Sequence, residues 1–212
     1  MKKSVAIIAL LVWPLYLNDL YLMALDNTRI GLLWALDVVF FLLIPTTTLV
    51  CLVRADRISL REIGFAKPPQ PISIIAGIAL CGILVVLDQW TLFPLLNQLP
   101  GRLFIGYDFP ASQPLRILTM IYAALTAGLL EEIVYRGVVT TELKKHVRSP
   151  AGVVLLSCLI FAGIHWSEGP GKSISTSFWA IIPTIWVLKR RSLWGPIVCH
   201  ALYDFLIFTR MV

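Results

Sequence analysis

The sequence predicts an all-α membrane protein, a polytopic bundle of about seven transmembrane helices with almost no soluble domain. Composition, recurring apolar runs and the placement of charge together predict this class. Of the 212 residues, 58% are hydrophobic and only 14% are charged, whereas a soluble domain carries roughly 25% charged residues. So little charge cannot cover a water-facing surface, and we therefore expect most of the chain to lie in a lipid bilayer.

Apolar runs of about 20 residues recur along the chain, and each is long enough to cross a hydrocarbon core of about 30 Å. We expect spans at residues 4–25, 30–53, 72–96, 115–143, 150–167, 174–188 and 193–210. No A-x-A site follows the first span, which is therefore expected to be an uncleaved signal anchor. The chain then divides into residues 1–71, two spans and a linker, and residues 72–212, an integrated core that carries the motifs below.

The basic residues predict the orientation of the chain in the membrane. If Met1 is cytoplasmic, 12 Lys and Arg side chains lie on the cytoplasmic side and 4 outside, which fits the positive-inside rule. The cytoplasmic set is Lys2, Lys3, Arg54, Arg57, Arg61, Lys67, Lys144, Lys145, Arg148, Lys189, Arg190 and Arg191, and the outer set is Arg29, Arg102, Lys172 and Arg210. We expect a cytoplasmic N-terminus, an outer C-terminus and an amphipathic linker from Arg54 to Pro71 at the cytoplasmic face. The net charge of +6 forms no continuous stripe, so no nucleic-acid partner is expected.

The fourth span carries three charged residues, Glu131, Glu132 and Arg136, in the stretch GLLEEIVYRGVV. Charged residues at membrane depth are costly, so they usually face the bundle interior and carry function. On a regular helix Glu132 and Arg136 share one face, the favourable i,i+4 arrangement, while Glu131 points elsewhere. We expect Glu132 to be neutralised by Arg136 and Glu131 to be left free to act as a general base.

Two of the three histidines also lie within spans. The i,i+4 spacings of Phe161 with His165 and of His200 with Asp204 place each pair on one helix face. Each feature alone has a structural alternative. The glutamates and Arg136 could form an ion pair or a proton relay, each histidine could hydrogen-bond a neighbouring helix, and Phe161 could be ordinary core. The conjunction of all three motifs favours an active site.

The motifs E-E-x-x-x-R, F-x-x-x-H and H-x-x-x-D, in this order and each on its own apolar helix, resemble those of the CAAX protease and bacteriocin-processing family of intramembrane endopeptidases. The resemblance covers residues from about Leu115 to Phe208, and SLREIGF before the third span is similar to that family's entry segment. It implies peptide-bond hydrolysis in the membrane, with Glu131 as general base and His165 helping to hold the attacking water. It also places His200 and residue 204 near the oxyanion, with Glu132 and Arg136 orienting the site.

Two details of the resemblance leave alternatives open. The family was long classed as metalloproteases, and Glu131, His165 and His200 could hold zinc, but there is no HExxH motif and a metal-free reaction is expected. Many members have asparagine at the position of Asp204. An ionised carboxylate only accepts hydrogen bonds, so Asp204 is expected either to be protonated or to orient His200.

The leading hypothesis is an intramembrane, glutamate-dependent endopeptidase acting on a membrane-anchored, CAAX-like protein or on a small peptide. An alternative is a non-catalytic scaffold or bacteriocin-immunity protein of the same fold. A third, a small proton-coupled transporter, would need paired halves with matching broken helices, which the sequence lacks.

Overall fold

The computed structural model describes residues 1–212 except 26–28, 67, 91–92, 97, 104–108 and 212, and its described residues form helices and connections without strands. The first part of the chain forms α1 (Lys2–Tyr16), α2 (Asn18–Ala24), α3 (Ile30–Asp37), η2 (Val38–Leu43), α4 (Ile44–Arg54), η3 (Arg61–Phe65), α5 (Pro71–Trp90) and α6 (Phe93–Leu96). The second part forms α7 (Gln113–Glu131), η4 (Glu132–Val139), α8 (Thr140–Lys144), α9 (Pro150–Ala162), η5 (Gly163–Glu168), α10 (Pro170–Trp179), α11 (Ile181–Arg190) and α12 (Trp194–Phe208). The predicted all-α class is confirmed.

Five helical stretches among the described residues are long and apolar enough to cross a membrane. They are Lys2–Tyr21, Ile30–Arg54, Pro71–Gln89, Gln113–Lys144 and Pro150–Glu168, and the shorter apolar helix Trp194–Phe208 follows them. Each corresponds to an expected span, so the chain is an integral membrane protein.

The sixth expected span, 174–188, is not one helix. The chain there forms α10, which ends at Trp179, and α11, which begins at Ile181. Pro183 lies in the first turn of α11 and lacks a backbone N–H, and its ring would clash with the carbonyl of residue 179 in a continuous helix. The expected span therefore has a helix break at Ala180, which hydropathy alone does not predict.

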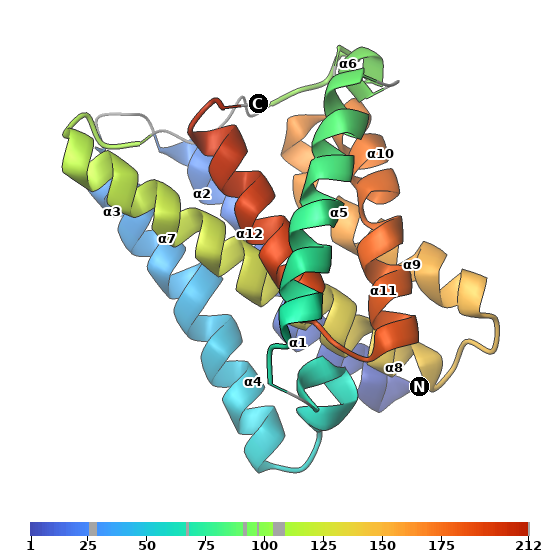
Figure 1. The fold of residues 1–212 in the computed structure, drawn as a ribbon. Coiled ribbons are helices and arrows are strands. Elements are labelled where there is room, and N and C mark those ends of the chain that lie inside the picture. Colours follow the sequence, from blue (N-terminus) through green and yellow to red (C-terminus); the bar gives the residue numbers. More distant parts are fainter. Residues whose placement is uncertain (26–28, 67, 91–92, 97, 104–108, 212) are drawn as a thin grey trace.

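The helices cross the bundle back and forth, so their connections gather at two opposite faces (Figure 1). One face holds Met1 and the connections 55–66, 68–70, 145–149 and 191–193, and we name it the N-terminal face. There His146 Nε2 lies 3.0 Å from Ser4 Oγ, and Leu193 N–H donates to the Gly64 carbonyl at 3.3 Å. The opposite, C-terminal face holds residues 98–112 as far as they are described, Gly169 and Thr209–Met211. There Leu103 N–H donates to the Ser167 carbonyl at 2.7 Å.

The expected amphipathic linker between α4 and α5 lies at the N-terminal face. Its apolar side chains Ile58 and Ile63 are buried, while its arginines are exposed. Gly64 has φ +112°, and a Cβ there would come within 2.9 Å of Leu193. Glycine therefore allows the linker to turn tightly beneath the start of α12.

Helix α12 packs between α5 and α7 (Figure 1). It approaches α7 closely at Gly128, where an added Cβ would lie 2.6 Å from the Ala201 backbone nitrogen. Small residues at a helix interface in a membrane let the two backbones approach closely. Because Glu131 follows Gly128 by three residues and His200 precedes Ala201, this approach brings the motifs of the two helices together.

Candidate active site

The first motif lies where the continuous helical stretch Gln113–Lys144 changes from α-helical to π-helical geometry. Glu131 is the last residue of α7, and Glu132 and Arg136 lie in η4, a π-helical stretch. Such stretches inside α-helices are frequent at functional sites. Every residue from 132 to 140 is buried, so the motif lies in the interior of the bundle.

Glu132 and Arg136 form the ion pair that their spacing predicts. Arg136 Nη1 lies 2.9 Å from Glu132 Oε1, and neither side chain has any exposed surface. The guanidinium also lies over the Phe161 ring, with Cζ 3.8 Å from its centroid, a favourable cation–π arrangement. Glu132 is thus held by charge, and Arg136 is held by both charge and an aromatic face.

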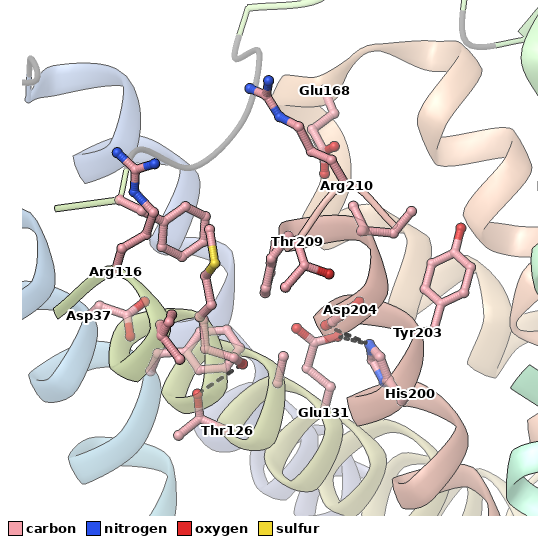
Figure 2. A pocket seen from close by; sticks show the side chains of 18 of the residues that line it. Asp37, Arg116, Thr126, Glu131, Glu168, His200, Tyr203, Asp204, Thr209 and Arg210 are labelled. Carbon is pink, nitrogen blue, oxygen red and sulfur yellow. Dashed lines mark hydrogen bonds and ion pairs between the residues drawn. The ribbon is translucent and has the colours of Figure 1, made fainter. Parts of the chain in front are cut away.

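His200 of α12 connects the two glutamates. Its Nδ1 lies 2.8 Å from Glu132 Oε1, and since an ionised carboxylate only accepts, Nδ1 donates this hydrogen bond. Its Nε2 lies 3.7 Å from Glu131 Oε2 and 3.5 Å from Asp204 Oδ2. Figure 2 shows Glu131, His200 and Asp204 converging, with the His200–Asp204 contact dashed. Both separations are longer than a normal N–H···O hydrogen bond, so these two carboxylates act on Nε2 mainly through their charge.

His165 approaches from the 3₁₀ stretch η5, which follows α9. Its Nδ1 lies 2.5 Å from Glu168 Oε1, and its ring contacts Phe161 edge to face with centroids 5.8 Å apart. Phe161 also meets His200 edge to face at 6.1 Å. The predicted supporting residue Phe161 therefore lies between the two histidines, and each imidazole has one carboxylate on Nδ1.

A cavity of about 1000 Å³ adjoins these residues. Glu131, His165, His200 and Asp204 all line it, whereas Glu132 and Arg136 do not. Apolar side chains also contribute to the wall, among them Phe41, Phe109, Ile117, Met120, Ile207 and Phe208. A cavity with a few convergent polar groups in an apolar wall is typical of a site that binds and transforms a substrate.

The predicted site residues thus divide into two groups. One group lines the cavity: Glu131, His165, His200 and Asp204. The other group lies outside its lining and contacts the first group or one another: Glu132, Arg136 and Phe161. Among the described residues, no group of three or more His, Cys, Asp or Glu side chains is arranged to hold a metal ion, the candidate set Glu131, His165 and His200 included. The metal-free reaction stays a prediction.

The structure adds residues that the motifs do not contain. Glu168 holds Nδ1 of His165, and the Trp179 ring lies against His200 with centroids 5.0 Å apart. Asp19 of α2 accepts hydrogen bonds from Ser167 Oγ at 2.6 Å and from its backbone N–H at 3.4 Å, which ties the first span to η5. The i,i+3 spacing of His165 and Glu168 on a helical stretch is a signal that could have identified Glu168.

Comparisons with known proteins agree with the motifs. The family model for the type II CAAX prenyl endopeptidase Rce1-like family matches residues 113–206, which include all three motifs. This match is consistent with the CAAX protease and bacteriocin-processing family and confirms the resemblance over these residues. No curated protein and no solved structure matches the chain.

Proposed function

We propose that this chain, whose residues 113–206 match the Rce1-like type II CAAX prenyl endopeptidase family model, hydrolyses peptide bonds within the membrane with Glu131 as the general base. The family supports a membrane protease. The position of Glu131 supports the role of base, because its carboxylate lines the cavity and its neighbour Glu132 is already paired.

In the proposed reaction Glu131 removes a proton from a water molecule as the water oxygen attacks the peptide carbonyl. His165, with Nδ1 engaged by Glu168, offers its other ring nitrogen to hold that water. The tetrahedral intermediate then collapses, the C–N bond breaks, and Glu131 returns the proton to the leaving amine. One carboxyl group thus serves as base and then as acid.

The developing oxyanion would lie near Nε2 of His200. Because Nδ1 already donates to Glu132, donation from Nε2 requires the protonated imidazole. Asp204, 3.5 Å from Nε2, favours that protonated form by its charge. Glu132, held by Arg136, fixes the ring orientation, so these two residues act through His200 and are positioning residues.

The observation that carries the proposal is the contrast between adjacent glutamates that meet the same histidine on opposite ring nitrogens. A purely structural ion pair accounts for Glu132 and Arg136, but not for a second carboxylate facing a cavity beside His165, His200 and Asp204. The expected substrate is a membrane-anchored protein or a peptide within the bilayer. No metal ion is expected to take part.

The direct test is incubation of the purified protein with a panel of membrane-anchored peptides, with cleavage read by mass spectrometry. The control is the Glu131→Gln variant, purified in the same way. Products that appear only with the unaltered protein support the proposal. If the folded protein and Glu131→Gln give the same products, Glu131 is not the base, and a non-catalytic scaffold or immunity protein becomes the better account.

A further inference from the structure

The cavity beside Glu131 reaches toward one face of the bundle only in the described structure. Its lining includes Gln113, the first residue of α7, and Thr209 and Arg210, which follow α12. These residues lie at the C-terminal face, and Figure 2 shows Arg116 and Arg210 at the opposite end of the cavity from Glu131 and His200. A substrate that enters from the C-terminal face therefore meets the catalytic groups at the far end of the cavity.

The helical stretch Gln113–Lys144, which carries Glu131, Glu132 and Arg136, is called the motif helix below. Toward the N-terminal face it is surrounded by packed protein. All residues from 132 to 140 are buried, and Gly137 lies against the linker, where an added Cβ would come within 3.1 Å of the Ile63 carbonyl oxygen. The cavity at this face is a separate one of about 990 Å³. It lies beyond Thr140, and its lining includes Arg61, Lys144, Lys145, Arg190 and Arg191 but neither Glu131 nor His200.

The structure shows how the basic residues are divided between the two faces. The N-terminal face gathers basic side chains from the start of α1 and from three connections, whereas the C-terminal face has Arg29, Arg102, Lys172 and Arg210, with Arg116 one turn into α7. Cytoplasmic loops are enriched in Lys and Arg, and this bias sets the orientation of a membrane protein. The N-terminal face is therefore assigned to the cytoplasm, and the cavity opens on the other side.

We infer that the substrate reaches Glu131 from the extracytoplasmic side, as an exported peptide or as a peptide segment exposed on the outer face of the membrane. That a substrate is cleaved at all rests on the proposed function. The side from which it enters rests on the geometry of the cavity and on the distribution of basic residues. A prenylated C-terminus anchored in the cytoplasmic leaflet would instead meet the basic N-terminal face, whose cavity is lined by neither Glu131 nor His200. On this inference, the substrate differs from the prenylated protein that the family description implies.

The side of the cavity is tested by labelling single introduced cysteines with a membrane-impermeant thiol reagent. Thr209→Cys lies in the cavity lining, Ser112→Cys is an exposed position on the C-terminal face, and Ser59→Cys is its exposed counterpart on the N-terminal face. The unaltered protein gives the background from its four native cysteines. We expect positions 209 and 112 to react in intact cells and position 59 to react only in inside-out vesicles. Labelling of position 209 from the cytoplasmic side alone overturns the inference.

Activity provides a second test that does not depend on introduced cysteines. The probe is a mixture of water-soluble, quenched fluorescent peptides of random sequence, added to sealed right-side-out or sealed inside-out vesicles, with vesicles containing Glu131→Gln as background. We expect Glu131-dependent cleavage in right-side-out vesicles and its loss in inside-out vesicles until detergent opens them. Cleavage in sealed inside-out vesicles overturns the inference.

The two tests separate the inference from the proposed function. If Glu131-dependent cleavage is absent even in detergent, the proposed function fails for these probes, while the labelling result still decides on which side the cavity opens. If cleavage is present but depends on the cytoplasmic side, the proposed function stands and the inference fails.

Discussion

The motif helix has two neighbouring glutamates, Glu132 and Glu131, with opposite surroundings: one is packed among partners and the other faces the cavity. On the packed side, Glu132 has no exposed surface, pairs with Arg136 and accepts a hydrogen bond from His200. On the cavity side, Glu131 is 6% exposed and meets the other nitrogen of that histidine only at 3.7 Å. A carboxylate with committed partners can hold other groups in place, whereas one beside a cavity can exchange a proton with what enters. In the proposed reaction, positioning and proton transfer are therefore divided between neighbours one residue apart.

The largest effect is expected from removing the cavity-side carboxylate. Glu131→Gln keeps the shape but loses the proton acceptor, so we expect activity to fall by about 10²–10⁴-fold, the contribution of a general base. The unfolding temperature in detergent should stay close to that of the unaltered protein. Glu62→Gln, which changes an exposed glutamate lining the separate basic cavity, is the matched control and should keep full activity. Retained cleavage by a well-folded Glu131→Gln protein would falsify the assignment.

On the packed side the same substitution should act through stability. Glu132→Gln leaves the buried Arg136 without its counter-ion, and breaking a buried pair typically costs about 3–5 kcal/mol. We expect a clearly lower unfolding temperature and reduced activity. Glu142→Gln is the control, because Glu142 is also buried but its partner Lys145 is 45% exposed. An unfolding temperature for Glu132→Gln as high as that of Glu142→Gln would show that the pair adds no special stability.

The parts of this site that depend on spacing within one helix are predictable from the sequence. The Glu132–Arg136 pair and the Phe161–His165 contact follow from i,i+4 positions, and both are present. The Glu132–His200 hydrogen bond joins residues 68 positions apart. It depends on how closely α7 and α12 approach at Gly128, and helical periodicity contains no information on that distance.

The fold shows the same limit. Apolar runs predict the five long spans and the last helix, because crossing a bilayer needs length and apolar character. They do not predict the π-helical geometry of η4 or the division of residues 170–190 into α10 and α11. Hydropathy reports the environment of a segment and does not report its backbone geometry, although Pro183 is a local signal for the division.

Substitution of Asp204 tests whether a cavity-lining residue beyond Glu131 and His200 contributes to the reaction. Its carboxylate lies 3.5 Å from His200 Nε2, whereas Glu132 already fixes the ring through Nδ1, so the role left to Asp204 is electrostatic. We expect Asp204→Ala to lose about 10²-fold in turnover, the scale of a lost oxyanion donor. Asp204→Asn should stay active because its amide can donate to an oxyanion directly. If Asp204→Ala cleaves at the full rate, residue 204 is packing and the cavity side ends at His200.

A smaller effect is expected at Glu168, which holds His165 in the way that Glu132 holds His200. Removing a carboxylate that orients a histidine costs about tenfold at the lower end of observed effects, so Glu168→Ala should lower kcat by that amount with little change in KM. In Glu168→Gln the amide oxygen can still accept from Nδ1, and we expect most of the rate to return. Equal losses in both variants would mean that the charge of Glu168, and not its hydrogen bond, supports the reaction.

Removal of metal ions should have the smallest effect of all. Both histidines have Nδ1 bound to a carboxylate, an arrangement that also orients histidine ligands in zinc sites, so this feature alone does not separate the two mechanisms. The described residues nevertheless gather no metal-binding group of three, and the proposed reaction needs only Glu131 and His165 to activate water. We therefore expect exhaustive chelation to leave turnover unchanged and active protein to contain no stoichiometric zinc by elemental analysis. Inactivation by the chelator that added zinc reverses would place Glu131, His165 and His200 around an ion instead, and the division between a positioning side and a proton-transferring side of the motif helix would have to be abandoned.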